Sequence, residues 1–343
     1  MKVFPAQLRA PLSSLALSAR SWALLLVVFL LHGCHPPEHS IDAGSAVIYL
    51  VEDVPAGLNY DGPAASLHTS QVGIVNLMDP LLEYAPSPKI ENGVKISDFS
   101  SFEGSLAQNW LYDPAEQSWR IDLRKGIYSC AGNELTADDV LYTFARAKSV
   151  SGAAPVGWFL ASVASVANFD TSVFGNPAKQ SLGDEVSKIG RYSVKIFQSA
   201  PNPLFPHVLT SFALRVFDSL EMRKHATEAD PWSHQYVDEH TSPGFGPYCT
   251  ERWIKGDKFV LTANPYRGDM APNIKRIVFK RVPLSSNRFV IMKMREANLS
   301  DRLTPREFEA LDGLENLKVI GLTGNETLFL HMNFKSPPFD NPL

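Results

Sequence analysis

The hydrophobic positions between residues 119 and 147 predict a strand, a loop and a helix. Large apolar side chains first alternate with polar or charged ones, the pattern of a half-buried strand: Trp119, Ile121 and Leu123. Glycines and small residues follow from 126 to 133, which predicts a loop. Apolar positions then return at helical spacing and make one helix face apolar: Val140, Phe144 and Ala147. Many folds contain this unit, so the pattern alone defines no function.

Polar residues predict where two helices begin. Thr136 has the chemistry of an N-cap, and Asp139 three residues later completes an acidic variant of the capping box. Thr304 gives a second start signal, because Pro305 is suited to the first turn of the helix that follows it.

Similar patterns predict the other elements. Short apolar or alternating runs predict strands at 46–51, 193–197, 274–282 and 327–334. Helical spacing predicts helices at 71–82, 288–295 and 304–311. Gly256 and Asp257 between two such runs predict a hairpin turn. A turn-rich loop from 53 to 63 follows the first strand.

Composition and charge narrow the class of protein. The 343 residues are 45% hydrophobic and 20% charged, which is typical of a globular protein of two or three domains. The formal net charge of −4 gives no sign of the basic surface that nucleic-acid binding requires. We therefore expect no nucleic acid among the partners.

The first residues have the organisation of an export signal. Basic residues precede a short apolar run, Trp22–Leu31, which is shorter than the ~20 apolar residues that a transmembrane helix needs. The next residues, Leu31–Cys34, resemble a bacterial lipobox, although His32 departs from its usual small residue. The resemblance implies a signal peptide at 1–33, lipidation of Cys34 and a tether at 34–45. A plain signal peptide with an incidental cysteine is the alternative.

Few residues are candidates for metal binding or catalysis. His35 and His39 are four residues apart, but the prolines between them disfavour a helix. A zinc or nickel site could use the side chains of His234, Asp238 and His240, but a polar loop is the favoured interpretation of this segment. The sequence contains no metalloprotease, nucleophile-elbow or phosphate-loop motif. We therefore predict no metal, no cofactor and no enzyme.

Several motifs occur in an order that resembles one protein family. The segments are Leu77–Tyr84, Phe102–Trp110, Leu123–Gly126 with Leu135–Val140, Gly244–Tyr248, and Pro337–Asp340. Together they resemble extracytoplasmic solute-binding proteins of the peptide/nickel class, bacterial family 5, the binding subunits of ABC importers. Phe245 departs from the usual serine or threonine between two glycines, which permit backbone paths closed to other residues. Arg295 and Asn298 also depart from the family pattern.

The resemblance implies an α/β fold of the large, type II periplasmic-binding-protein class. Two lobes with mixed sheets and a small extra subdomain are expected. The first lobe would comprise 46–85 and 186–283, and the subdomain would comprise 86–185. Residues 284–343 would begin a second lobe that the chain leaves incomplete. Residues that grip a peptide's ends in this family would then lie beyond Leu343, so we expect a fragment that does not bind solute as it stands.

The resemblance also implies a site and partners. Residues expected at the rim of the first lobe are Leu58, Asn59, Tyr60, Trp158, Phe245 and Tyr248. The solute would be a peptide, or nickel, a sugar or haem, and it would pass to a membrane permease and its ATPase. The protein would sit on the periplasmic or cell-surface side of a bacterial membrane, held by its lipid.

Two further hypotheses stay open. One is an envelope hydrolase that uses scattered Ser, His and Asp residues. The other is a structural lipoprotein that keeps the fold without a ligand.

The cysteine count is odd. With Cys34 lipidated, Cys130 and Cys249 remain, and export favours oxidation. Both flank motifs of the resembled family. The sequence leaves open whether they form a disulfide or stay as two isolated thiols.

Overall fold

The structure is a computed structural model that describes residues 46–61, 67–149, 156–167, 185–211, 214–322 and 332–341. Residues 46–343 group into one unit, separate from residues 1–45. The predicted signal peptide, Cys34 and the tether lie outside the described residues. Most of the strand predicted at 327–334 also lies outside them.

A five-stranded mixed sheet carries the site described below. Its strand order is β11-β1-β10-β9-β8. The first strand in the sequence, β1, is parallel to its two neighbours, β10 and β11. Strands β8 and β9 form the antiparallel hairpin predicted at Gly256, and β9 also pairs with β10 in antiparallel fashion. The strands span Ala46–Val51 (β1), Tyr248–Ile254 (β8), Lys258–Ala263 (β9), Arg276–Arg281 (β10) and Leu299–Ser300 (β11).

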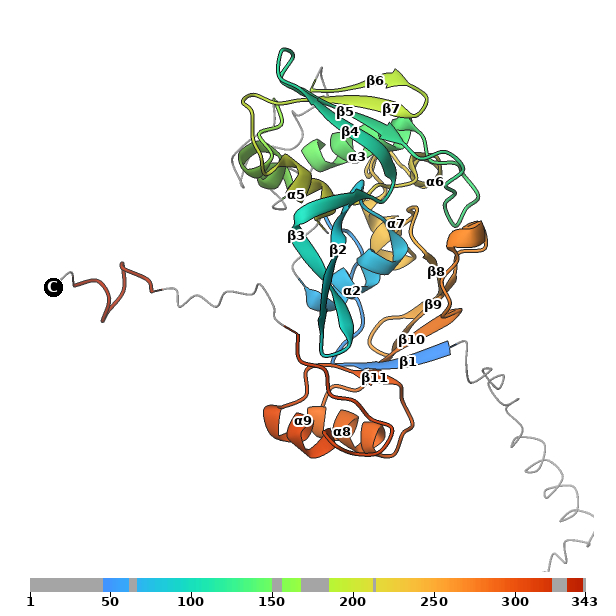
Figure 1. The fold of residues 1–343 in the computed structure, drawn as a ribbon, viewed down its shortest axis with the longest axis vertical. Helices are drawn as coiled ribbons and strands as arrows, with labels where there is room; N and C mark the ends of the chain where they lie inside the picture. The colour runs from blue at the N-terminus through green and yellow to red at the C-terminus, as the bar shows by residue number, and fades with distance from the viewer. Residues whose placement is uncertain are drawn as a thin grey trace, which may run out of the picture. The chain divides into compact units, whose positions relative to one another are not determined.

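Alternate side chains of β1 enter two different hydrophobic clusters. Tyr49 and Val51 belong to the large cluster, which includes buried residues of α2 (His68–Leu77). Ile48 and Leu50 belong to the small cluster. Helices α8 (Ser285–Lys293) and α9 (Pro305–Leu311) contribute Met292 and Leu311 to that second cluster and lie together next to β11 (Figure 1). Because side chains alternate across a strand, β1 separates the two clusters.

The chain between β1 and β10 builds two other sheets. One is the long hairpin of β2 and β3, and the other is an antiparallel sheet in the order β4-β5-β7-β6 (Figure 1). Helix α3 packs against β6 and β7. The bounds are Leu82–Glu91 (β2), Val94–Gly104 (β3), Ala107–Asp113 (β4), Ser118–Leu123 (β5), Ala137–Ser149 (α3), Val186–Gly190 (β6) and Ser193–Phe197 (β7).

The remaining helices are short. They are α4 (Val156–Trp158), the π-helical turn η2 (Phe159–Val163), α5 (Phe205–Thr210), α6 (Ser219–Lys224), α7 (His234–Glu239) and the 3-10 turn η4 (Gly268–Met270).

The strand, loop and helix predicted from residue 119 are confirmed as β5 and α3. The Asp139 carboxylate accepts hydrogen bonds from the Thr136 N–H (2.7 Å) and hydroxyl (3.1 Å). Its other oxygen accepts from the Ser219 N–H (2.8 Å), so one buried aspartate joins the start of α3 to the start of α6. The start of α9 predicted at Thr304 is also confirmed, with Pro305 in its first turn, and the structure adds a capping box between Thr304 and Glu307.

Two predicted boundaries differ from the structure. The helix predicted to extend to Leu82 ends at Leu77, because Pro80 disfavours helical geometry in the residue before it and Leu82 begins β2. The four-stranded sheet crosses the subdomain boundary that was expected after residue 185. Strand β7 pairs with β5 from Ser118↔Phe197 onward, so β6 and β7 belong to the same sheet as β4 and β5.

Gly246 lets two backbone segments approach closely. Its N–H donates to the Leu77 carbonyl (3.0 Å) at the end of α2. A Cβ added to Gly246 would lie 2.3 Å from the Leu77 carbonyl carbon. Neither Gly244 nor Gly246 has a positive φ. The glycine is therefore required by lack of space rather than by an unusual backbone conformation.

We expect Gly246→Ala to lower the free energy of unfolding by about 3 kcal/mol, because the obstacle is backbone that cannot move aside as a side chain can. The measurement is urea unfolding followed by circular dichroism. Gly256→Ala is the matched control: Gly256 has φ +76° and open space around it. It should cost only about 1 kcal/mol of backbone strain. Equal losses in the two variants would show that the close approach is unimportant.

Candidate solute-binding site

A cavity of about 380 Å³ lies at the carboxyl ends of the parallel strands. It is bordered by residues 51–56 at the end of β1, by Arg281 and Pro283 at the end of β10, and by Asp301 and Arg302 after β11. The first turns of α2 cover another side. Ligands of open α/β sheets bind outside the carboxyl ends of the strands, and this volume is in the range of small-molecule pockets.

The cavity has aromatic and aliphatic walls. Phe259 of β9 and Phe279 of β10 both line it, with ring centroids 6.0 Å apart. Gly73 in α2 allows the helix to pack closely on this wall. A Cβ there would come within 2.9 Å of Leu58 and 3.3 Å of Phe259. At Gly73 the helix therefore forms the cavity wall with backbone rather than with a side chain.

The rim of the cavity carries two pairs of opposite charge. Arg281 Nε lies 2.9 Å from Asp53 Oδ1, which also accepts a hydrogen bond from the Val54 N–H. His68 Nε2 lies 3.2 Å from Asp301 Oδ2. All four side chains are between 31% and 54% exposed. Exposed pairs of this kind stabilise a fold little, so they can exchange partners with a charged solute at low cost.

Tyr49 of β1 orients one of the carboxylates of this rim, that of Asp301. Burial, and then a hydrogen bond to Asp301, raise the pKa of Tyr49 above its ordinary value. The hydroxyl therefore stays protonated and donates to the Asp301 carboxylate. Asp301 is thus oriented by Tyr49 from β1 and by His68 from α2.

The loop residues predicted to contact solute lie in the core instead. Leu58, Asn59 and Tyr60 are at most 2% exposed, and none of them lines the cavity. The Tyr60 hydroxyl donates to the Arg215 carbonyl (2.8 Å), and its ring stacks on Phe217. The Asn59 amide donates to the His234 carbonyl (2.9 Å).

A buried arginine explains why this part of the loop turns inward. Arg146 of α3 is fully buried and forms an ion pair with Asp61, with Nε 2.7 Å from Oδ2. It also donates to the Asn59 side chain and to the Trp232 carbonyl. A buried guanidinium needs several acceptors, and residues 59–61 supply two side chains of that kind. The exposed residues of the loop are Glu52, Asp53 and Ala56, in its first half.

Phe245 and Tyr248 do not line the cavity either. Phe245 is fully buried, and its carbonyl accepts from Arg267 Nη1 (2.9 Å). Tyr248 is 6% exposed, and its hydroxyl donates to the Ile274 carbonyl (3.0 Å). Trp158 is in α4, but its side chain lies outside the described residues.

The candidate metal ligands His234, Asp238 and His240 are not brought together as a site. Within the described ranges, no group of three or more His, Cys, Asp or Glu side chains is arranged to hold a metal ion. His234 Nδ1 instead lies 3.2 Å from Asp230 Oδ1. The described residues also contain no helix that is long and apolar enough to cross a membrane.

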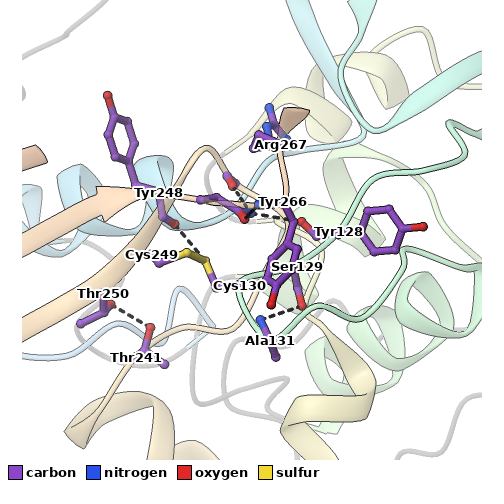
Figure 2. Close-up of a disulfide and its surroundings, with 12 residues drawn as sticks. Tyr128, Ser129, Cys130, Ala131, Thr241, Tyr248, Cys249, Thr250, Tyr266 and Arg267 are labelled. Atoms are coloured by element: carbon purple, nitrogen blue, oxygen red, sulfur yellow. Dashed lines mark hydrogen bonds between the residues drawn. A yellow bond between two sulfur atoms is a disulfide. The ribbon is translucent and has the colours of Figure 1, made fainter. Parts of the chain in front are cut away.

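Cys130 and Cys249 form a disulfide in the structure. It joins the loop after β5 to the second residue of β8, across 119 positions of sequence, and Figure 2 shows the Tyr248 ring pointing away from it. The neighbouring Ser129 hydroxyl donates to buried Asp218 (2.5 Å). The 3.5 Å contact of Cys130 Sγ with the Tyr248 carbonyl is not a hydrogen bond, because a disulfide sulfur has no proton. The loop is thus attached at two neighbouring residues.

Comparison with known proteins decides the family. Residues 101–343 match bacterial extracellular solute-binding proteins, family 5 Middle. The chain belongs to this family. Family 5 consists of solute-binding proteins. The chain is 22% identical over 238 residues to the probable D,D-dipeptide-binding periplasmic protein DdpA of Escherichia coli, which covers 69% of the chain and 41% of that relative.

Solved structures share the fold of this family 5 chain. A dipeptide-binding protein from a Pseudoalteromonas species, in complex with Met-Leu, has a TM-score of 0.68 at 16% identity, covering 86% of the chain and 55% of that protein. The binding protein MoaA from Agrobacterium tumefaciens, in complex with mannopinic acid, has a TM-score of 0.60 at 18% identity, covering 86% and 53%. The expected type II periplasmic-binding-protein fold is confirmed. The chain spans about half the length of these proteins.

The residues that line the cavity of this family 5 protein were missed from sequence, although a signal existed. The turn-rich loop after the first strand was recognised, but its second half was chosen instead of residues 52–56. Arg281 is the last residue of β10, and Asp301 and Arg302 directly follow β11, as expected of residues at the carboxyl edge of a sheet. That position is a stronger signal than the aromatic character of Tyr60 or Tyr248.

Asp79 is a buried carboxyl beneath the Gly244–Tyr248 segment. Arg267 Nη1 lies 2.9 Å from Asp79 Oδ2 and also donates to the Phe245 carbonyl. Burial raises the pKa of Asp79 from 3.8 to about 6, and the Arg267 charge opposes this only in part. The protonated form is therefore favoured more in the folded chain than in the unfolded chain.

This raised pKa predicts how stability depends on pH. Asp79 contributes roughly 3 kcal/mol to the free energy of unfolding at low pH. This contribution is fully present below about pH 4 and is lost as the pH rises through 6. Asp79→Asn keeps an oxygen that accepts from Arg267 but cannot titrate. We expect the variant to gain stability relative to wild type between pH 4 and 7, as measured by urea unfolding at each pH. Parallel profiles for the two proteins would contradict the raised pKa.

Proposed function

We propose that this chain is the substrate-binding component of an ABC importer and that it captures short peptides. The cavity supports the proposal because its rim carries acidic side chains, Asp53 and Asp301, and basic ones, Arg281 and Arg302. A peptide carries both charges at its ends, and each can replace one partner of an exposed pair. The name of the Escherichia coli relative also points to peptides.

Capture requires no chemical step in this proposal. The solute would be bound by non-covalent contacts, and any change of conformation would be driven by its better contacts with one state than with the other. The apolar walls at Phe259 and Phe279 would accept side chains of varied size. The loaded protein would then deliver the peptide to a membrane permease and its ATPase, outside the cytoplasm.

Peptide binding is tested by isothermal titration with a panel of peptides of different lengths. The sequence led us to expect a fragment that does not bind, but the cavity formed by the described residues leads us to expect binding by the wild-type chain. Ala56→Trp should lose roughly ten-fold or more in affinity, because the new indole occupies a cavity that binds by shape and burial. Ala56 is exposed and lines the cavity, so the substitution adds volume without opening the core.

The matched control for that experiment is Ala115→Trp. Ala115 is exposed in the turn between β4 and β5 and is not among the cavity residues. It should bind as the wild type does. Equal affinity in both variants would place the peptide site elsewhere. Binding of sugars or opine-like acids but of no peptide would reject the peptide class.

We also propose that the protein is exported and held at a membrane by a lipid on Cys34. The support is the basic and apolar run before Leu31–Cys34. In bacterial cells we expect mass spectrometry of the mature protein to find an N-terminal, lipid-modified Cys34. Cys34→Ser should move the protein from the membrane fraction to the soluble one. An N-terminus at another residue with unmodified Cys34 would support the plain signal peptide.

A further inference from the structure

Arg288 of α8 is a buried cation whose recorded partners are backbone carbonyls. The residue is 2% exposed. Its Nη1 donates to the carbonyls of Val282 (2.6 Å) and Pro283 (2.8 Å), and its Nη2 donates to the carbonyl of Arg302 (2.9 Å). No ion pair recorded in the described ranges includes it. The guanidinium thus donates its hydrogen bonds to main-chain carbonyls rather than to a carboxylate.

The three carbonyls belong to two separate segments of the chain. Val282 and Pro283 lead from β10 into α8, while Arg302 follows β11 on the way to α9. Pro283 and Arg302 also line the cavity. Arg281 directly precedes Val282, and Asp301 directly precedes Arg302. One side chain therefore ties together two stretches of the cavity rim, including the residues next to both rim ion pairs.

The chemistry of arginine suits this arrangement better than any other side chain. Its planar head carries five donors in a fixed fork, whereas lysine offers one compact charge. The surrounding cluster is apolar, with Leu50, Met292 and Leu303 buried in it. A charge in such a place is costly, and Nε remains without a partner among the described residues. Stability alone would be served equally well by an apolar residue, so the cost calls for another role.

We propose that Arg288 is a positioning residue that couples the two rim segments, so that they move as one when a solute enters the cavity. Its link to solute binding rests on the proposed function, but the coupling is a property of the chain without solute. Loss of the guanidinium fork removes hydrogen bonds from the segment after β10 and from the segment after β11 at the same time. A residue that only fills the core would not have this signature.

Hydrogen exchange followed by mass spectrometry tests the coupling in the absence of solute. We expect Arg288→Met to exchange amides of residues 282–288 and of residues 299–304 roughly ten-fold faster or more, because hydrogen bonds to a charged group are lost at both segments. Arg288→Lys should behave in the same way, since it keeps the charge but lacks the fork. Amides of β5 and β7 should be unchanged. Arg306→Met, an exposed arginine in α9, is the matched control and should match the wild type.

Three results would overturn the coupling. They are faster exchange at one segment alone, equal acceleration throughout the sheets in both Arg288 variants, or no difference from Arg306→Met. If Arg288→Met does not fold, Arg288→Lys decides the question by the same exchange measurement.

A second measurement uses the dipeptide Met-Leu and titration calorimetry. Arg288→Lys should bind it roughly ten-fold more weakly than Arg306→Met does, because two free rim segments must be ordered on binding. If the wild type binds no peptide, the proposed function fails while the exchange result still decides the coupling. If the wild type binds Met-Leu and Arg288→Lys binds it equally well, Arg288 has no positioning role in binding.

Discussion

Parallel pairing of β1 with β10 and β11 is the constraint on which the rest of this structure depends. Hydrogen bonds in register from Ala46↔Arg276 to Val51↔Arg281 bring the first described strand beside a strand near the other end. Parallel strands end at the same edge, so the loops that follow β1, β10 and β11 must meet there. The cavity lies at that meeting point. Strand direction thus assembles the part of the rim that follows the strands, and the first turns of α2 complete it.

Buried arginines shape the loops around this sheet. Arg146 draws residues 59–61 into the core, and Arg288 holds the segments after β10 and β11. Each guanidinium must satisfy several donors away from water, so each takes carbonyls or polar side chains from loops that have no regular structure of their own. The loops gain defined positions in return. Placing the rim charges therefore depends on polar groups that never contact solvent.

The site combines permanent and exchangeable parts. Phe259, Phe279 and Gly73 are held by the packing of the sheet against α2, so the apolar walls are formed before any solute arrives. Asp53, Arg281, His68 and Asp301 are partly exposed and paired only weakly with one another. In the proposed function the rim must hold solute and also release it. Apolar burial with exchangeable ion pairs is suited to both tasks, because the ion pairs of the empty rim are weak and cost little free energy to break.

The sequence by itself determined the local elements and the family. Period-two alternation in β5, the capping box before α9 and the ordered motifs all depend on residues close together in the chain, and all agree with the structure or the comparisons. Tertiary structure decided which side chains meet. It paired Cys130 with Cys249, extended the second sheet to Phe197 and buried Tyr60 and Phe245, which had been expected at the rim. Those outcomes depend on contacts between distant segments. The segments of Tyr60 and Phe245, for example, supply acceptors to Arg146 and Arg267. A pattern along one strand or one loop contains no information about such contacts.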